Sequence, residues 1–148
     1  MSGETRSEVR LVSREDIRKF AVATRVTGPH HHDVDAARAR GYRDVVAPPY
    51  YFTALGLSFG RIVPRDELAE SGLPVADPLS TRRPVAGECS VEWFGDIIAG
   101  DEIVVSERLV DIVAKQGQSG RMELYHYERQ YRRGLKLLVR ERFIRIAR

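Results

Sequence analysis

The chain has one cysteine, Cys89, among its 148 residues. This excludes an internal disulfide and argues against a metal site built on cysteine, so we expect Cys89 to be a buried structural thiol. No apolar run approaches the roughly 18 residues that a membrane span requires. The polar start, Met-Ser-Gly-Glu-Thr-Arg, lacks the apolar core of a signal peptide. We therefore expect a cytoplasmic protein with no membrane partner.

Lysine is also scarce, because arginine supplies 21 of the 24 basic side chains, and the formal net charge is only +3. The basic residues alternate with acidic and apolar ones and form no contiguous basic helix, which argues against a nucleic-acid partner. We interpret most of them as a solvated sheet face. One or two arginines at the mouth of a cleft are suited to binding phosphates, and Arg82 and Arg83 are the candidates.

The first half of the chain carries the signals of helices. A Ser-x-x-Asp capping box precedes apolar residues at helical spacing, and a proline pair opens an uncharged apolar stretch that predicts a buried central helix, although its aromatic residues also permit a strand. A long segment rich in Pro, Gly, Asp and Ser follows, which is typical of a functional loop. The predicted helices are Ser13–Thr24, Val34–Arg40 and Tyr50–Phe59, with a short one near Asp66–Ser71 in this loop.

The second half carries the signals of strands. Apolar and polar residues alternate over four segments that glycine-containing turns separate, and no crossover helix lies among them. This pattern predicts an antiparallel meander after a buried helix, which is an α+β fold. The length fits a single domain over residues 1–148. The predicted strands are Glu88–Trp93, Glu102–Ala114, Met122–Tyr131 and Leu135–Ile146.

Three consecutive histidines, His30-His31-His32, lie between the first two predicted helices. Adjacent side chains project in different directions and no cysteine or glutamate cluster lies nearby, so we expect no metal site. Imidazole is a good general base near neutral pH if an acid accompanies it, and otherwise His31 is a loop residue bonded to the backbone. Asp33 is a candidate for that acid, although its position also suits a cap of the next helix.

The order of these elements resembles the hot-dog fold, in which a curved antiparallel sheet wraps one helix, from about Val9 to Arg145. Three segments resemble the MaoC-like dehydratases and (R)-specific enoyl-CoA hydratases, in particular their N-terminal-type domains. These segments are Arg-Glu-Asp-Ile-Arg-Lys-Phe-Ala at Arg14–Ala21, Val-Ala-Pro-Pro at Val46–Pro49, and the Gly-x-Ser-Gly turn at Gly117–Gly120.

The resemblance also shows where this chain departs from the hydratases. Their active-site loop resembles Gly-Asp-x-Asn-Pro-Leu-His, in which the Asp and the His share one catalytic water. Here only Pro29 and His31 match, and the Asp falls on Val26. In the hydratases a backbone N–H polarises the thioester carbonyl. The corresponding segment here is Ala47-Pro48-Pro49, and proline has no N–H. The resemblance therefore implies the half of a double hot dog that lacks the catalytic pair.

The function that the resemblance implies is (R)-specific hydration of enoyl thioesters, or dehydration of 3-hydroxyacyl thioesters, carried by coenzyme A or an acyl carrier protein. No cofactor is expected. The partner is a catalytic MaoC-like chain in a heterodimer, or a second copy in a homodimer. Tyr50, Tyr51 and Phe52 are candidates for substrate contact, although aromatic residues on a central helix are more often core. Two alternatives remain open, namely a self-sufficient homodimeric dehydratase or lyase that uses His31 with an acid from elsewhere, and a non-enzymatic acyl-ligand binding or scaffold protein.

Overall fold

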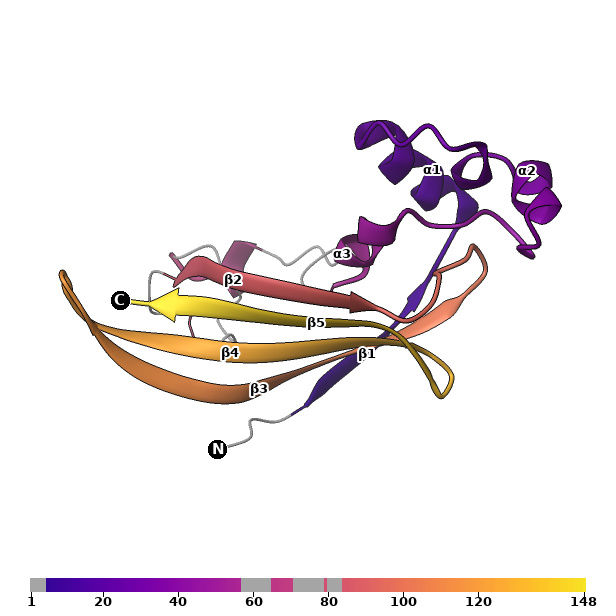
Figure 1. Ribbon diagram of the computed structural model, residues 1–148. Coiled ribbons are helices and arrows are strands. Elements are labelled where there is room, and N and C mark those ends of the chain that lie inside the picture. The colour runs from indigo at the N-terminus through magenta and orange to yellow at the C-terminus, as the bar shows by residue number, and fades with distance from the viewer. Residues whose placement is uncertain (1–4, 57–64, 71–78, 80–83) are drawn as a thin grey trace.

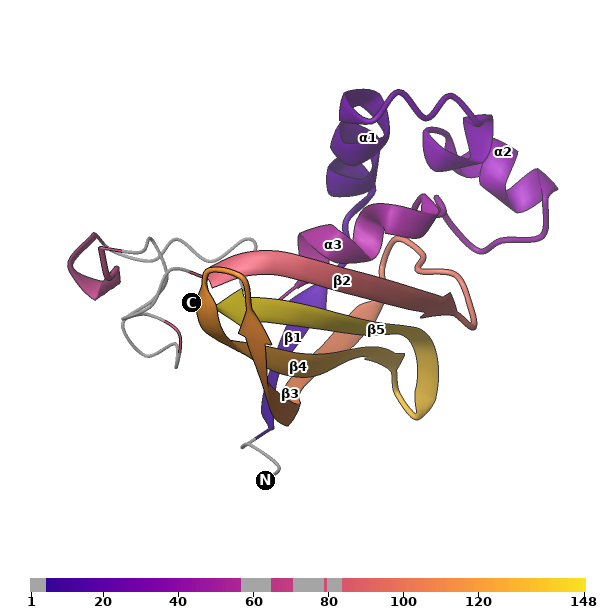
Figure 2. The ribbon, with the colours of Figure 1, turned by 60° about the vertical axis from the view of Figure 1, so that its left-hand side comes forward.

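The computed structural model describes residues 5–56, 65–70, 79 and 84–148. The elements run in the order β1 (Arg6–Leu11), α1 (Arg14–Ala23), α2 (Val34–Ala39), α3 (Phe52–Leu55), β2 (Pro84–Trp93), β3 (Glu102–Gly117), β4 (Gly120–Arg133) and β5 (Lys136–Ala147), and short 3-10 turns cover Pro29–His31, Pro49–Tyr51 and Arg65–Glu67. The strands form one antiparallel sheet in the order β1-β3-β4-β5-β2. Helix α3 lies over the face toward which the sheet curves, and α1 and α2 lie beyond it at one end (Figure 1). A second view shows the same arrangement (Figure 2).

Helix α1 begins as its sequence predicts. The Oγ atom of Ser13 accepts a hydrogen bond from the backbone N–H of Asp16 at 3.0 Å, which satisfies one of the free donors of the first turn. Ile17 and Ala21 share the buried face of the helix. Phe20 places its ring edge to face with the ring of Tyr51, with centroids 5.5 Å apart. The predicted helix is confirmed, and it packs against the segment that leads into α3.

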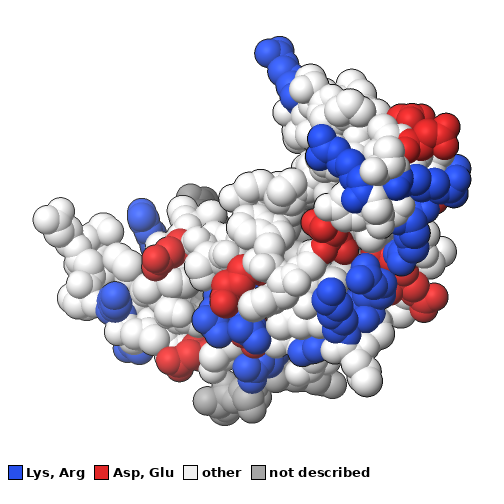
Figure 3. Space-filling view, turned by 45° about the vertical axis from the view of Figure 1, so that its right-hand side comes forward, with Lys and Arg blue, Asp and Glu red and all other residues white. Residues whose placement is uncertain are grey.

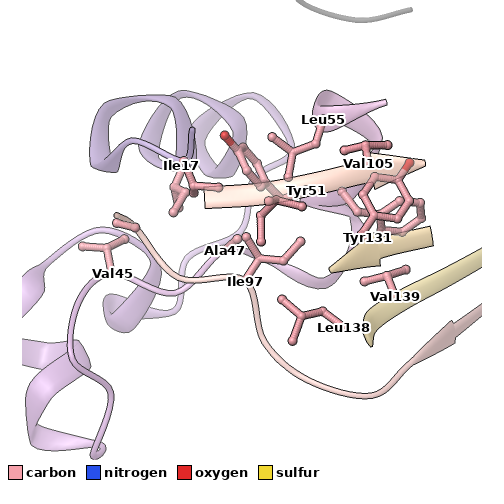
Figure 4. Packing of buried hydrophobic residues seen from close by; sticks show 14 residues of the cluster. Ile17, Val45, Ala47, Tyr51, Leu55, Ile97, Val105, Tyr131, Leu138 and Val139 are labelled. Carbon is pink, nitrogen blue, oxygen red and sulfur yellow. The ribbon is translucent and has the colours of Figure 1, made fainter. Parts of the chain in front are cut away.

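The core lies between α3 and the sheet. Tyr131 of β4 lies opposite Val105 of β3 and Val139 of β5, and directly opposed residues of an antiparallel pair share one face. Phe52 of α3 meets this face edge on, 5.3 Å from the ring of Tyr131. All four of these side chains are buried (Figure 4). Burial raises the pKa of Tyr131 above its ordinary value.

Strand β1 was not among the predicted elements. Charged residues alternate with Ser7, Val9 and Leu11, and the two apolar ones, Val9 and Leu11, are 53% and 75% exposed. It is a strand because it pairs with β3 at the edge of the sheet, from Arg6 opposite Glu107 to Leu11. A pattern of buried residues therefore does not mark this strand.

The predicted central helix is shorter in the described residues. A 3-10 turn over Pro49–Tyr51 leads into α3, and Gly56 ends the helix because its backbone is extended, with ψ of 153°. Positions 57–59 of the prediction lie outside the described residues. In the long loop, a 3-10 turn over Arg65–Glu67 stands where a short helix was predicted, and Ser71 lies outside the described residues.

Cys89 corrects one prediction, because its side chain is exposed rather than buried. It lies on β2, which forms an edge of the sheet and is exposed along most of its length. Partial burial and the nearby Glu141 carboxylate raise the pKa of the thiol.

None of the helices in the described part of the chain is long and apolar enough to cross a membrane.

Candidate functional site

The histidine loop is held by the segment that leads into α3. The backbone N–H of Val46 donates to the carbonyl of His30 at 3.0 Å, and the carbonyl of Val46 lies 2.6 Å from Nδ1 of His31. On its other side Val46 forms an antiparallel bridge with Ile98, which lies in the connection between β2 and β3. Three segments that are far apart in the sequence therefore form one hydrogen-bonded unit.

His31 makes its contact from a buried position, with 8% of the residue exposed. A carbonyl oxygen can only accept a hydrogen bond, so Nδ1 must carry the proton in its contact with Val46. The other ring nitrogen, Nε2, is then the only one that can exchange a proton with a ligand. His31 thus has a structural hydrogen bond, and acid or base chemistry is open to it through Nε2 alone.

His30 lies between His31 and a tyrosine. Its ring centroid is 3.9 Å from that of His31 and 6.4 Å from that of Tyr42. Burial lowers the pKa of His30, the nearby His31 and Arg40 lower it further, and the Asp96 carboxylate opposes them. A Cβ atom at position 28 would lie 2.9 Å from Cε1 of His30, so a side chain there would force this ring to shift.

The third histidine and the aspartate after it point to other partners. Nε2 of His32 lies 2.6 Å from the carbonyl of Val26, so this nitrogen is the protonated donor. The Oδ2 atom of Asp33 accepts from the backbone N–H of Ala36 at 2.9 Å and caps α2. His31 and His32 therefore bond to different backbone carbonyls, and the described residues contain no group of His, Cys, Asp and Glu side chains that could hold a metal ion.

Two carboxylates that we did not predict lie in the connection between β2 and β3, one near His30 and one that holds the connection itself. Asp96 lies within electrostatic reach of His30 and accepts a side-chain hydrogen bond from Tyr42, whose pKa it raises through its negative charge. Asp101 is buried, with a side chain that is 1% exposed, and it accepts from the backbone N–H of Ile98 and from Nη1 of Arg133, both at 2.9 Å. In the sequence each of them only follows a glycine, at Gly95-Asp96 and Gly100-Asp101, in the predicted turns between strands.

A cavity of about 510 Å³ opens beside this unit. Its walls come from three separate segments, which supply Ala47, Ile97 and Val139 (Figure 4). Trp93 closes one side, because its Nε1–H donates to the carbonyl of Pro49 at 2.8 Å. The cavity is mainly apolar with one carboxylate, and its lining residues are Ala47, Pro48, Pro49, Trp93, Gly95, Asp96, Ile97 and Val139.

The other predicted contact residues separate into two groups. Tyr51 and Phe52 lie in the hydrophobic core, and burial raises the pKa of Tyr51 to about 12. Tyr50 is 60% exposed, and its ring meets that of Trp93 edge to face at 5.2 Å, next to the cavity. Contact between these residues and a substrate stays a prediction. Arg82 and Arg83 lie outside the described residues.

Comparison with known proteins places this arrangement in a family. The model of the FAS1-like dehydratase domain region matches residues 2–138. The chain belongs to this dehydratase family. Among its relatives, the UPF0336 protein Franean1_6066 of Parafrankia sp. (strain EAN1pec) is 36% identical over 104 residues, which make up 68% of this chain and 62% of that protein. The chain thus matches less than two thirds of the length of that relative.

Solved structures of low sequence identity share the fold. The ChsH1-ChsH2 complex from Mycobacterium tuberculosis matches 98% of this chain and 87% of the compared chain, with a TM-score of 0.70 and 22% identity. The truncated HadBC (3R-hydroxyacyl-ACP dehydratase) complex from the same organism matches 97% of this chain and 95% of its own, with a TM-score of 0.70 and 16% identity. The hot-dog fold and the resemblance to MaoC-like dehydratases are thereby confirmed.

Within this dehydratase family, Val26 occupies the position that the resemblance gives to the catalytic Asp. Its backbone N–H donates to the carbonyl of Ala21 at 2.8 Å, and its own carbonyl accepts from His32. Position 26 therefore serves to join the end of α1 to the histidine loop. Among the described residues, the carboxylate that lines the cavity beside this loop is Asp96 rather than a loop residue.

Proposed function

We propose that this chain is one subunit of an (R)-specific enoyl-thioester hydratase or 3-hydroxyacyl-thioester dehydratase. In this assembly it is the half without the catalytic pair, and it shapes the acyl pocket while a MaoC-like partner chain supplies the Asp and the His. The substrate is an acyl thioester of coenzyme A or of an acyl carrier protein. A cytoplasmic location belongs to the same proposal.

The cavity wall at Pro48 and Pro49 is the observation that carries this proposal. Hydration of an enoyl thioester passes through an enolate-like oxygen, which enzymes stabilise with hydrogen-bond donors aimed at that atom. Neither proline has an N–H, and the carbonyl of Pro49 is already bonded to Trp93. An acyl group fits the apolar lining of this cavity, but the wall at these two residues offers its thioester oxygen no backbone donor.

The β2 edge of the sheet, on which no other described strand pairs, supports a partner chain. Strand β2 ends the sheet, and Val85, Trp93 and the adjacent Phe94 are 46%, 42% and 49% exposed. An edge strand with exposed apolar side chains is protected when it pairs with another strand. The solved structures of similar fold include the ChsH1-ChsH2 and HadBC complexes. We propose that a catalytic MaoC-like chain pairs with this chain along β2.

The test is a hydration assay with crotonyl-coenzyme A and longer 2-enoyl-coenzyme A, which follows the loss of absorbance of the conjugated thioester. We expect no turnover with the purified chain alone, and turnover after co-expression with a MaoC-like chain that keeps Gly-Asp-x-Asn-Pro-x-His. The His31→Ala variant should retain that activity, as should His126→Ala, which changes a histidine of β4 remote from the loop. Absence of turnover with every such partner would refute the proposal.

A second candidate is a self-sufficient homodimeric dehydratase, and the position of Asp96 favours it. This carboxylate lines the cavity and lies near His30, so an acid is present although the loop lacks one. The same assay separates the two candidates. Turnover by the purified chain alone, abolished both in His31→Ala and in Asp96→Asn, would establish the homodimer in place of the accessory subunit.

A further inference from the structure

The turn between β4 and β5 brings basic side chains to the rim of the cavity. Arg133 and Lys136 lie opposite each other at the end of this hairpin, and opposed residues share one face of the sheet. Nη1 of Arg133 donates to the backbone carbonyl of Asp96 at 3.2 Å and to the Asp101 carboxylate at 2.9 Å. Since Asp96 lines the cavity, these contacts fix the hairpin end to its rim.

Lys136 lies against the neighbouring rim residue. A Cβ atom at Gly95 would be 3.3 Å from both Cε and Nζ of Lys136, so the side chain passes directly over this glycine. Gly95 lines the cavity, and Lys136 is exposed. No carboxylate of the described residues lies within ion-pair distance of its ammonium group, whereas Lys19 on α1 pairs with Glu15 at 3.1 Å. Lys136 is therefore a cation at the cavity mouth whose charge no described acid neutralises.

The surrounding charges leave this corner cationic. Arg43 and Arg133 share one carboxylate, that of Asp101, and their side chains are 51% and 31% exposed. The contacts that Arg133 makes with described residues all use Nη1, which leaves its remaining N–H groups for another partner. Asp96 is the other acid of the rim and accepts a hydrogen bond from Tyr42. Lys and Arg side chains gather on this side of the molecule, below the helices (Figure 3).

We propose that Lys136 and Arg133 form a phosphate site at the mouth of the cavity, and that it holds the phosphate of the carrier arm whose acyl group occupies the cavity. This inference rests on the proposed function, because it requires that the cavity receives an acyl thioester. Lysine offers a compact charge and arginine a planar fork of donors, and both suit phosphate oxygens. The shared chemistry is a phosphate ester of pantetheine, which coenzyme A and a carrier protein both provide.

The test is isothermal titration of the purified chain with 4′-phosphopantetheine, with coenzyme A and with pantetheine, which has no phosphate. We expect Lys136→Ala to weaken both phosphate-bearing ligands about tenfold and to leave pantetheine unchanged, because one exposed charge-assisted hydrogen bond is lost. Lys136→Arg should restore most of the affinity. Lys115→Ala is the matched control, because it removes an exposed lysine near the β3–β4 turn, at the other end of the sheet (Figure 1).

Equal affinities of wild type and Lys136→Ala for the phosphate-bearing ligands would overturn the inference, as would wild type that binds neither of them. A loss that extends equally to pantetheine would also overturn it, because the lysine would then act on the cavity itself. Titration with coenzyme A, with 3′-dephospho-coenzyme A and with a phosphopantetheinylated carrier protein tells which source is preferred. Hydration assays on the same variants with a partner chain distinguish failure of the phosphate site from failure of the proposed function. Turnover with an unchanged KM in Lys136→Ala would refute the phosphate site and leave the proposed function intact.

Discussion

Replacement of Asp101 by asparagine tests how the cavity wall is held. Its buried carboxylate accepts from the N–H of Ile98 and from Arg133, and it forms an ion pair with Arg43. Its backbone carbonyl also accepts from the N–H of Val12 at 3.0 Å, which joins this turn to β1. Asparagine has the same shape and can still accept from Ile98, but its uncharged amide no longer attracts the two guanidinium groups.

The expected loss of stability depends on how well Arg43 and Arg133 are solvated once the carboxylate is gone. A hydrogen bond to a charged group contributes about 1.5–3 kcal/mol, and removal of one member of a buried ion pair costs about 3–5 kcal/mol. Both values must be reduced because the side chains of Arg43 and Arg133 are 51% and 31% exposed, so water can solvate them after the change. We therefore expect Asp101→Asn to lower the free energy of unfolding by about 2 kcal/mol.

Urea unfolding at neutral pH measures this loss, provided that the free energy of unfolding of wild type and of Asp101→Asn falls with the same slope against urea concentration. Asp111→Asn is the control, because this exposed carboxylate of β3 contacts the N–H of the next residue, Ile112, at 2.8 Å. It should change stability by less than about 0.5 kcal/mol. Adding Arg133→Met to Asp101→Asn should cost less than the sum of the single changes, since the two residues share one interaction. A loss below about 1 kcal/mol for Asp101→Asn, or full additivity, would refute this account of the wall.

Two further predictions concern single carboxylates. Asp33→Ala should lower the free energy of unfolding by about 1 kcal/mol through loss of the α2 cap, whereas Asp33→Ser should keep stability within a few tenths of that of wild type. If Asp33→Ser were as stable as wild type but inactive in the hydration assay with a partner, Asp33 would be catalytic in addition to capping α2. A hydrogen bond from Arg14 lowers the pKa of Asp44 from 3.8 to about 2, so this carboxylate adds stability above pH 3.8 that is lost as the pH falls toward 2. The stability difference between wild type and Asp44→Asn, measured by urea unfolding from pH 6 downward, should shrink over that window, and a constant difference would contradict the assignment.

Local chemistry explains which parts of the fold were predictable. The cap of α1 at Ser13 depends on residues within one turn of each other, so the sequence contains the whole signal. Strands β3, β4 and β5 show alternation because one face packs on the core, for example at Tyr131. Strand β1 has no such face, and its identity comes from pairing with β3, more than ninety residues later in the chain. An edge strand of this kind depends on its partner and not on its own pattern.

The same distinction between local signals and contacts of distant segments applies to the candidate site. The histidine loop was predictable as a motif, and its caps and turns are local. The carboxylate near the loop was not, because Asp96 lies in the β2–β3 connection, which meets the segment beside the loop through the bridge between Val46 and Ile98. That bridge depends on how the connection between β2 and β3 folds against the segment before α3. A sequence pattern marks Gly-Asp as a turn, but it does not show which loop the turn will face.

The position of His31 shows why a matching histidine does not establish catalysis. Its Nδ1 proton is committed to the carbonyl of Val46, and the next residue back, His30, accepts from the N–H of the same Val46. These two bonds fix the loop to the segment that leads into α3 whether or not an acid stands at position 26. A structural requirement alone is therefore sufficient to explain a histidine at position 31. In the accessory subunit that we propose, the residues that distinguish it from a catalytic half are instead Val26, which supplies no carboxylate, and Pro48 and Pro49, which supply no backbone N–H.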